Sequence, residues 1–155
     1  MIKVAVIGVG SISECHLDAY VKNKDAELYA ICDINPETLK RQGDRYNIPE
    51  ERRFLDYKEL LKLPEIDAVS VCTWNSEHAP VTIAALQAGK NVLCEKPMAT
   101  TLADCERMVE AAKKSGKKLM IDQNQRLAGA HVKARELIEQ GEIGSVITFA
   151  TGFRH

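Results

Sequence analysis

Short apolar runs alternate with segments of helical periodicity along most of the chain. The runs contain many β-branched residues, which is typical of strands that are buried on both faces of a parallel sheet. We predict strands at Lys3–Ile7, Glu27–Cys32, Arg53–Leu55, Ala68–Thr73, Asn91–Cys94 and Lys118–Ile121. Because strands and helices alternate, the expected fold is α/β, a doubly wound parallel sheet with helices on both faces. Ligands of such sheets bind beyond the carboxyl ends of the strands.

The helical segments are each predicted to bury one face. The face expected for the first helix consists of Ile12, Cys15, Ala19 and Tyr20. The face expected for a later helix consists of Leu102, Cys105, Met108, Val109 and Ala112. Asn35 followed by Pro36 predicts a helix start between them, because Asn caps helices and Pro suits the first helical position.

The pattern changes after Ile121, and we assign residues 1–124 to the sheet domain and residues 125–155 to the beginning of a second domain. This last segment is predicted to form a helix through Leu137 to Gly141 and then a strand at Val146–Thr151. One helix and one strand do not make a domain, so we expect the chain to be the N-terminal part of a longer protein. The strand would leave an unpaired edge, which predicts a homo-oligomer.

Composition narrows the classes of partner. The 155 residues include 21 Lys+Arg and 22 Asp+Glu, and the net charge of −1 leaves no field of one sign to attract nucleic acid or an anionic membrane. The N-terminal apolar run is too short to span a membrane and lacks a signal-peptide cleavage site. The five cysteines are scattered without a C-x-x-C pair, which argues against disulfides and a zinc site. We therefore expect a cytoplasmic protein without a bound metal.

The turn after the first strand carries the glycines of a dinucleotide-binding site. Gly8-Val9-Gly10 follows the strand directly and leads into a helix at Ser11 and Ile12. In a Rossmann-type domain the first glycine permits the tight turn, and the second lets the backbone approach the pyrophosphate. The helix start would offer free N–H groups and a partial positive charge. Ser13 replaces the third Gly or Ala of this fingerprint, and its side chain is small enough for that position.

Asp33 strengthens this prediction, since two glycines alone also suit an ordinary turn. It ends the second predicted strand, about twenty residues after Gly10, which is the separation expected for an acid that binds the adenosine ribose. A carboxylate there accepts hydrogen bonds from the 2′-OH and repels a 2′-phosphate, so NAD is expected and NADP is less favoured. The alternative is that Asp33 merely begins an Asx turn before Pro36.

Four short motifs follow one another from Thr73 onward. They are Thr73-Trp74-Asn75-Ser76-Glu77-His78, Glu95-Lys96-Pro97, Asn124-Gln125-Arg126 and Gly141-Glu142-Ile143-Gly144. In this order they resemble the T-P-N-x-x-H, E-K-P, N-x-R and G-x-I-G elements of the glucose-fructose oxidoreductase/inositol dehydrogenase (Gfo/Idh/MocA) family. Trp74 stands where the family usually has proline. The resemblance extends from Val4 to about Thr151.

The resemblance implies an NAD(P)-dependent oxidoreductase that acts on a hydroxyl or keto group of a sugar, sugar nucleotide or cyclitol. It implies that Lys96 is catalytic, stabilising a developing alkoxide beside the nicotinamide and relaying its proton. It also implies that Glu95 contacts the cofactor's ribose. The other residues assigned to the cofactor cleft are Thr73, Trp74, Asn75, His78 and Asn124.

Each assignment has a structural alternative. Glu95-Lys96-Pro97 could be a solvated turn in which Pro97 ends the strand. His78 could be a surface or capping residue in the first turn of a helix, and Trp74 could fill the core. We interpret His16 and His131 as ordinary residues of predicted helices.

Two functions therefore stay open at this stage. The chain is either the cofactor-binding half of a dehydrogenase, or a non-catalytic NAD-binding module such as a redox sensor or regulatory subunit. Lys96 discriminates between them, because a pure binding module has little need for it. In either case we expect residues 1–155 alone to bind NAD and to catalyse little.

Overall fold

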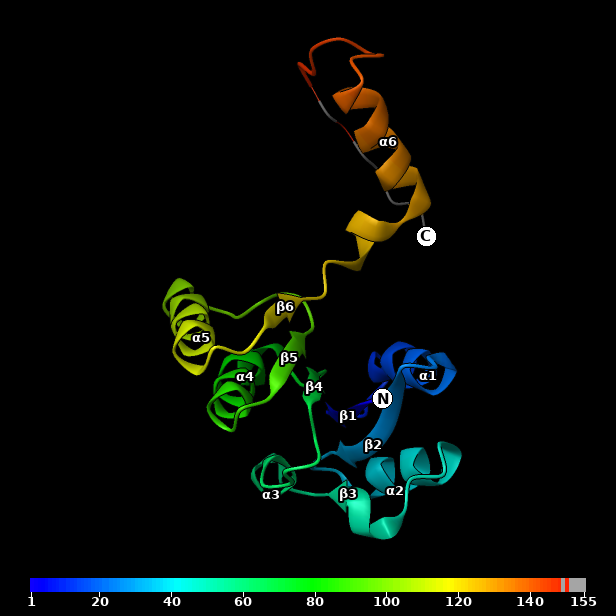
Figure 1. Ribbon diagram of the computed structural model, residues 1–155, viewed down its shortest axis with the longest axis vertical. Helices are drawn as coiled ribbons and strands as arrows, with labels where there is room; N and C mark the ends of the chain where they lie inside the picture. The colour runs from blue at the N-terminus through cyan, green and yellow to red at the C-terminus, as the bar shows by residue number, and fades with distance from the viewer. Residues whose placement is uncertain (149, 151–155) are drawn as a thin grey trace. The chain divides into compact units, whose positions relative to one another are not determined.

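The computed structural model describes residues 1–148 and 150, in which a six-stranded parallel sheet is the main element. The strands are β1 (Ile2–Ile7), β2 (Ala26–Cys32), β3 (Arg53–Phe54), β4 (Ala68–Val71), β5 (Asn91–Cys94) and β6 (Leu119–Ile121). Their order across the sheet is β3-β2-β1-β4-β5-β6, which is the Rossmann order. The predicted fold class is therefore confirmed (Figure 1).

Helices cover both faces of this sheet. They are α1 (Ser13–Lys22), α2 (Pro36–Arg45), α3 (Tyr57–Leu61), α4 (His78–Gln87) and α5 (Leu102–Ser115). The first two lie on one face, and α3, α4 and α5 lie on the other (Figure 1). Short 3-10 turns occur at Glu50–Arg52 (η1) and Asn75–Glu77 (η2). Asn35 caps α2 as predicted, since its side chain accepts hydrogen bonds from the N–H groups of Glu37 and Thr38.

Successive residues of the central strands pack into two separate hydrophobic clusters. Val6 and Ile31 join Leu17 of α1 and Leu39 of α2 in the smaller cluster. The larger cluster lies on the opposite face, with members that include Ala5, Ile7, Ala30, Cys32, Leu60, Val81, Leu86 and Met108. Both faces of the central strands are therefore buried, which explains why their sequences are apolar without alternation.

The six strands predicted for the sheet are confirmed with small differences at their ends, and the difference at the end of β4 matters for the site. β4 ends at Val71, whereas the apolar pattern predicts strand as far as Thr73. Its neighbour β1 ends at Ile7, and Cys72 makes the last contact, donating from its N–H to the Ile7 carbonyl at 2.8 Å. Gly8 then turns the chain away, so Thr73 has no strand beside it to pair with.

The predicted buried face of α1 is largely wrong, since Tyr20 is its only member that packs against the core. Its buried residues are Ser13, His16 and Leu17, whereas Ile12 is 45% exposed and Cys15 and Ala19 also face solvent. The helix is rotated from the expectation because Ser13 and His16 find buried polar partners, which the apolar pattern does not reveal.

The predicted face of α5 is only partly covered. Met108 is buried, but Leu102 is 75% exposed and Val109 is 41% exposed. Leu102, Cys105 and Val109 line a shallow surface groove along the helix. The periodicity therefore identifies an apolar stripe correctly, while only part of that stripe packs on the sheet.

The chain divides into two compact units, Met1–Asp122 and Gln123–His155, so the division falls close to the boundary predicted at residue 124. In the second unit, η3 (Asn124–Leu127) precedes α6 (Gly129–Glu139), and the predicted helix is confirmed. The assignment of this unit to the beginning of a second domain stays a prediction.

The strand expected at Val146–Thr151 is not formed over residues 146–148 and 150, because a strand requires a hydrogen-bonded neighbour and these residues pair with none in the described part of the chain. Phe149 and Thr151 lie outside the described residues. Ile147 is 95% exposed, and self-association through this segment stays a prediction that light scattering can test. Across residues 1–148 and 150, no helix is both long enough and apolar enough to cross a bilayer.

Substitution of Gly8 tests the turn that ends β1. Gly8 has a φ of +86°, and a Cβ atom there would lie 2.7 Å from the carbonyl carbon and oxygen of Cys72. We expect Gly8→Ala to lower the free energy of unfolding by about 2–4 kcal/mol, through both the strained φ and the backbone clash. Urea denaturation followed by far-UV circular dichroism measures this loss.

Gly10→Ala is the matched control, because a Cβ at Gly10 meets no atom within 4 Å. Its free energy of unfolding should stay within about 0.5 kcal/mol of the wild-type value. Equal losses in the two variants would contradict the role assigned to Gly8.

Candidate functional site

The candidate site lies where the chain leaves the carboxyl ends of β1, β2, β4 and β5. β1 pairs with β2 on one side and with β4 on the other, so the connections after β1 and β4 run in opposite directions. This topological switch point is where open parallel sheets bind ligands. These loops and the helix starts that follow them contain every site residue predicted from the sequence except Asn124.

The two glycines of the first loop have different roles. The Gly8 N–H donates to the Cys32 carbonyl at 2.8 Å, and the missing side chain lets Gly8 lie against the backbone of Cys72. Gly10 is not required by any such contact, since a Cβ atom there would point into open space. The protein's own packing thus explains Gly8, whereas the absence of a side chain at Gly10 leaves room for a ligand to approach the backbone.

The start of α1 is suited to bind an anion. Ile12 occupies the cap position, and no side chain caps the helix. The N–H groups of Ser13 and Glu14 donate to the Gly10 and Ser11 carbonyls at 3.3 Å. Ser11 and Ile12 are exposed, and within the described residues their N–H groups have no hydrogen-bond acceptor, so these two can donate to a ligand. Ser13 is buried, and its hydroxyl donates to the Gly10 carbonyl at 2.6 Å, which holds the turn against the helix. Serine therefore fills the third fingerprint position as expected. These residues fit the pyrophosphate of a dinucleotide.

Asp33 lies beside the same turn. One carboxylate oxygen accepts a hydrogen bond from the Val9 N–H at 2.8 Å, and the other accepts one from the Asn35 N–H at 2.8 Å. The second bond is the Asx turn considered from the sequence, and the first ties the end of β2 to the glycine loop. Asp33 remains partly exposed, and its oxygens keep lone pairs that could accept further bonds from ribose hydroxyls.

Lys96 follows β5 on the same edge of the sheet, and its side chain is exposed. Glu95 before it is buried, at 4% exposure, and its Oε2 accepts a hydrogen bond from the Lys96 N–H at 3.1 Å. The Glu95 N–H in turn donates to the Val71 carbonyl of β4 at 2.9 Å. This segment is therefore held to the sheet through Glu95, rather than forming the freely solvated turn considered as an alternative.

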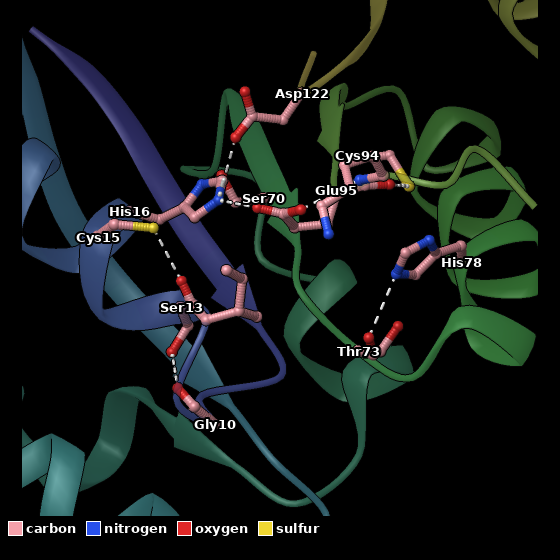
Figure 2. A network of polar contacts seen from close by, with 12 residues as sticks. Gly10, Ser13, Cys15, His16, Ser70, Thr73, His78, Cys94, Glu95 and Asp122 are labelled. Carbon is pink, nitrogen blue, oxygen red and sulfur yellow. Dashed lines mark hydrogen bonds and ion pairs between the residues drawn. The ribbon is translucent and has the colours of Figure 1, made fainter. Parts of the chain in front are cut away.

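The second carboxylate oxygen of Glu95 lies in a cluster with His16 and Asp122, which the sequence analysis did not assign to the site. His16 Nε2 lies 3.0 Å from Glu95 Oε1 and 3.6 Å from Asp122 Oδ2 (Figure 2). Interpreting His16 as an ordinary helical residue was therefore incomplete, since it is buried in a polar cluster beside the site. The three ligand-type atoms lie within 4.8 Å of one another. No spacing in the sequence reveals this cluster, because its members come from α1 and from the ends of two distant strands.

His78 is also buried, at 1% exposure, and it joins two loops. Its Nδ1 lies 2.7 Å from the Pro97 carbonyl oxygen. Its Nε2 lies 3.2 Å from the Thr73 carbonyl oxygen (Figure 2). Neither the surface position nor the capping role considered for it is observed. The side chain holds the loop after β4 against the loop after β5, and its contact with a cofactor stays a prediction.

The loop after β4 presents other predicted residues to solvent. Trp74 is 81% exposed, so it does not fill the core, and Asn75 is exposed as well. Thr73 is half-buried. Asn124 is exposed in η3 of the second unit.

Buried thiols form part of the floor beneath these loops. Burial raises the pKa of Cys32 to about 12 and that of Cys94 to about 11, and it raises the pKa of Cys72 further. Because a thiol must ionise to act as a nucleophile, these three cysteines are inert packing residues. All five cysteines are free, in agreement with the expectation of no disulfide framework.

Comparisons with known proteins agree with this geometry. Residues 2–123 match the model of an oxidoreductase family with an NAD-binding Rossmann fold. The chain is 36% identical to the myo-inositol 2-dehydrogenase of Thermotoga maritima, over 92% of this chain and 42% of the relative. The chain therefore spans less than half of the length of this curated relative.

Solved structures give the same result. The aldose-aldose oxidoreductase of Caulobacter crescentus is 38% identical, with a TM-score of 0.84 over 92% of this chain and 44% of that one. The WlbA dehydrogenase of Bordetella pertussis, solved with NADH and UDP-GlcNAcA, is 34% identical, with a TM-score of 0.86 over 92% of this chain and 43% of that one. With its Rossmann sheet, glycine turn and matching relatives, this chain belongs to the Gfo/Idh/MocA family of oxidoreductases.

Proposed function

We propose that this chain is the cofactor-binding part of an NAD-dependent dehydrogenase that acts on a hydroxyl or keto group of a cyclitol, sugar or sugar nucleotide. The observation that carries the proposal is the pairing of two features on one edge of the sheet. One is an open, uncapped helix start behind Gly10, and the other is an exposed Lys96 whose backbone is fixed by Glu95. A pure binding module has a use for the first feature only.

The class of substrate rests on the relatives. They include inositol 2-dehydrogenases, a D-apiose dehydrogenase and an aldose-aldose oxidoreductase. These names share a polyhydroxylated ring or chain that carries an oxidisable secondary or anomeric centre. We infer that residues 125–155 begin the domain that completes the substrate pocket, and that Asn124, Thr73 and Asn75 border the cofactor.

Lys96 is the group that we assign to proton transfer. When bound, NAD supplies the hydride acceptor for oxidation of the substrate carbon. The Lys96 amine would hold the reacting hydroxyl and accept its proton as the carbonyl forms, and the reverse reaction would use the same proton. In the reverse direction, the protonated Lys96 would stabilise the developing alkoxide by its positive charge and return the proton to it.

Gly10→Ala tests the pyrophosphate site. The added methyl group would occupy the open space against the backbone without disturbing the fold, so NADH should bind at least about tenfold more weakly, a loss of about 1.4 kcal/mol. Trp74 is the only tryptophan and it is exposed beside the site, so quenching of its emission by NADH measures the dissociation constant. Unchanged affinity in this variant would count against pyrophosphate binding at Gly10, and failure of the wild-type chain to bind NADH would overturn the proposed function.

Asp33→Asn tests the preference for NAD over NADP. Asn keeps an oxygen that can accept a hydrogen bond from the Val9 N–H, but it removes the negative charge that would repel a 2′-phosphate. We expect the wild type to bind NADH more tightly than NADPH. The ratio of the NADPH dissociation constant to the NADH dissociation constant should fall by about tenfold or more in the variant. Competition titrations of both nucleotides give this ratio. An unchanged ratio would remove Asp33 from cofactor selection.

Lys96→Met tests the catalytic assignment in a chimaera of residues 1–155 with the C-terminal half of the Thermotoga relative. Loss of a general acid–base should lower turnover of inositols and aldoses by about 10²–10⁴-fold, while NADH affinity changes little. Lys22→Met is the matched control, because Lys22 is exposed at the end of α1, and it should leave turnover unchanged. A Lys96→Met chimaera that keeps its turnover would show that another group carries the proton.

A further inference from the structure

His16 belongs to a buried polar cluster that joins three separate elements. It lies in α1, whereas Glu95 follows β5 and Asp122 follows β6. Its Nε2 atom is 3.0 Å from Glu95 Oε1 and 3.6 Å from Asp122 Oδ2, and the imidazole points between the two carboxylates (Figure 2). An ionised carboxylate only accepts hydrogen bonds, so a hydrogen bond from His16 to ionised Glu95 requires the proton on Nε2.

The cluster has a clear electrostatic requirement. Glu95 is 4% exposed, and the side chain of Asp122 is 19% exposed, so two mostly buried carboxylates lie with oxygen atoms within 4.8 Å of each other. Without a donor between them, they would repel and lose the hydrogen bond that compensates for their burial. His16 is therefore the residue that allows Glu95 to stay buried and oriented.

Glu95 also contacts the backbone of Lys96. Its Oε1 contacts His16, while its Oε2 accepts a hydrogen bond from the Lys96 N–H at 3.1 Å. One carboxylate thus connects α1 to the backbone of the residue assigned to proton transfer. The same helix begins at Ser13, whose hydroxyl donates to Gly10 in the predicted pyrophosphate turn.

We propose that His16 is a positioning residue that fixes the Lys96 segment relative to helix α1, acting through the Glu95 carboxylate. This inference rests on the proposed function for its consequence, which is that the nicotinamide half and the pyrophosphate half of the cofactor are held at a set separation. The contacts of His16 do not depend on the proposed function, so the positioning role and the function can be tested separately.

A pair of substitutions tests the position of the donor. The amide nitrogen of Gln can take the place of His Nε2, whereas that of Asn corresponds to Nδ1 and falls short of Glu95. His16→Gln should bind NADH within about threefold of the wild type, and His16→Asn should bind about tenfold more weakly, the effect of losing one hydrogen bond to a charged group. Both variants keep a polar side chain, and thermal melts verify that each is folded. His131→Gln is the control for histidine replacement, since His131 is exposed in the second unit.

A second measurement does not depend on cofactor binding. In chains labelled with ¹⁵N-lysine, the Lys96 amide resonance should move in His16→Asn and stay near its wild-type position in His16→Gln. If His16 acts through Glu95, then in a Glu95→Gln background the change from His16 to Asn should alter NADH affinity by less than about twofold. If His16→Gln does not fold, the Gln amide has not replaced Nε2, and the proposal is overturned.

Several outcomes would overturn the proposal. They are equal NADH affinity of the Gln and Asn variants, a Lys96 amide that does not respond to His16, and full additivity with Glu95→Gln. Chelation by EDTA that reproduces the His16→Asn result would show instead that the three residues hold a metal ion. If the wild-type chain fails to bind NADH while the Lys96 amide responds as expected, the proposed function is wrong and the positioning by His16 stands.

Discussion

The approach of Gly8 to the backbone of Cys72 is the contact on which the arrangement of the site depends. β1 and β4 run side by side as far as Ile7 and Val71, and the chain must then leave β1 without a side chain in the way. A positive φ at Gly8 achieves this and directs the chain into α1. The positions of Gly10, Ser13 and His16 all follow from the direction of this one turn, so the pyrophosphate site and the buried cluster share a single origin.

The sheet could be predicted from the sequence because its strands are buried on both faces. Continuous apolar runs such as Val4–Ile7 need no tertiary information to stand out, and glycine and proline mark the places where they end. The glycine turn and Asp33 could be identified for a related reason, since both follow directly after such runs, whereas Lys96 was assigned through the resemblance of Glu95-Lys96-Pro97 to the family's motif. The end of β4 was less predictable, because Cys72 and Thr73 are as apolar or β-branched as the strand, and only the departure of β1 decides where pairing stops.

The remaining features depend on partners that are distant along the chain. Ser13 and His16 count as polar in any periodicity, yet both are buried, because Gly10 and Glu95 supply hydrogen-bond partners. The apolar pattern therefore predicted the wrong buried face for most of α1. For α5 the opposite error occurred, since an apolar stripe does not show whether anything covers it, and Leu102 and Val109 remain exposed. His78 posed a third problem, because nothing in the sequence indicates that its ring bridges two loops.

The two hydrophobic clusters are unequal, and this has a consequence for how the domain opens. The layer of α1 and α2 rests on the smaller cluster, whereas α3, α4 and α5 share the larger one. Segments with fewer buried apolar contacts open at lower free energy, so the layer that carries the glycine turn is expected to exchange its amide hydrogens first. A dinucleotide bound there raises that opening free energy in proportion to the logarithm of its concentration. Protease resistance of α1 would then report how much cofactor is available to the protein.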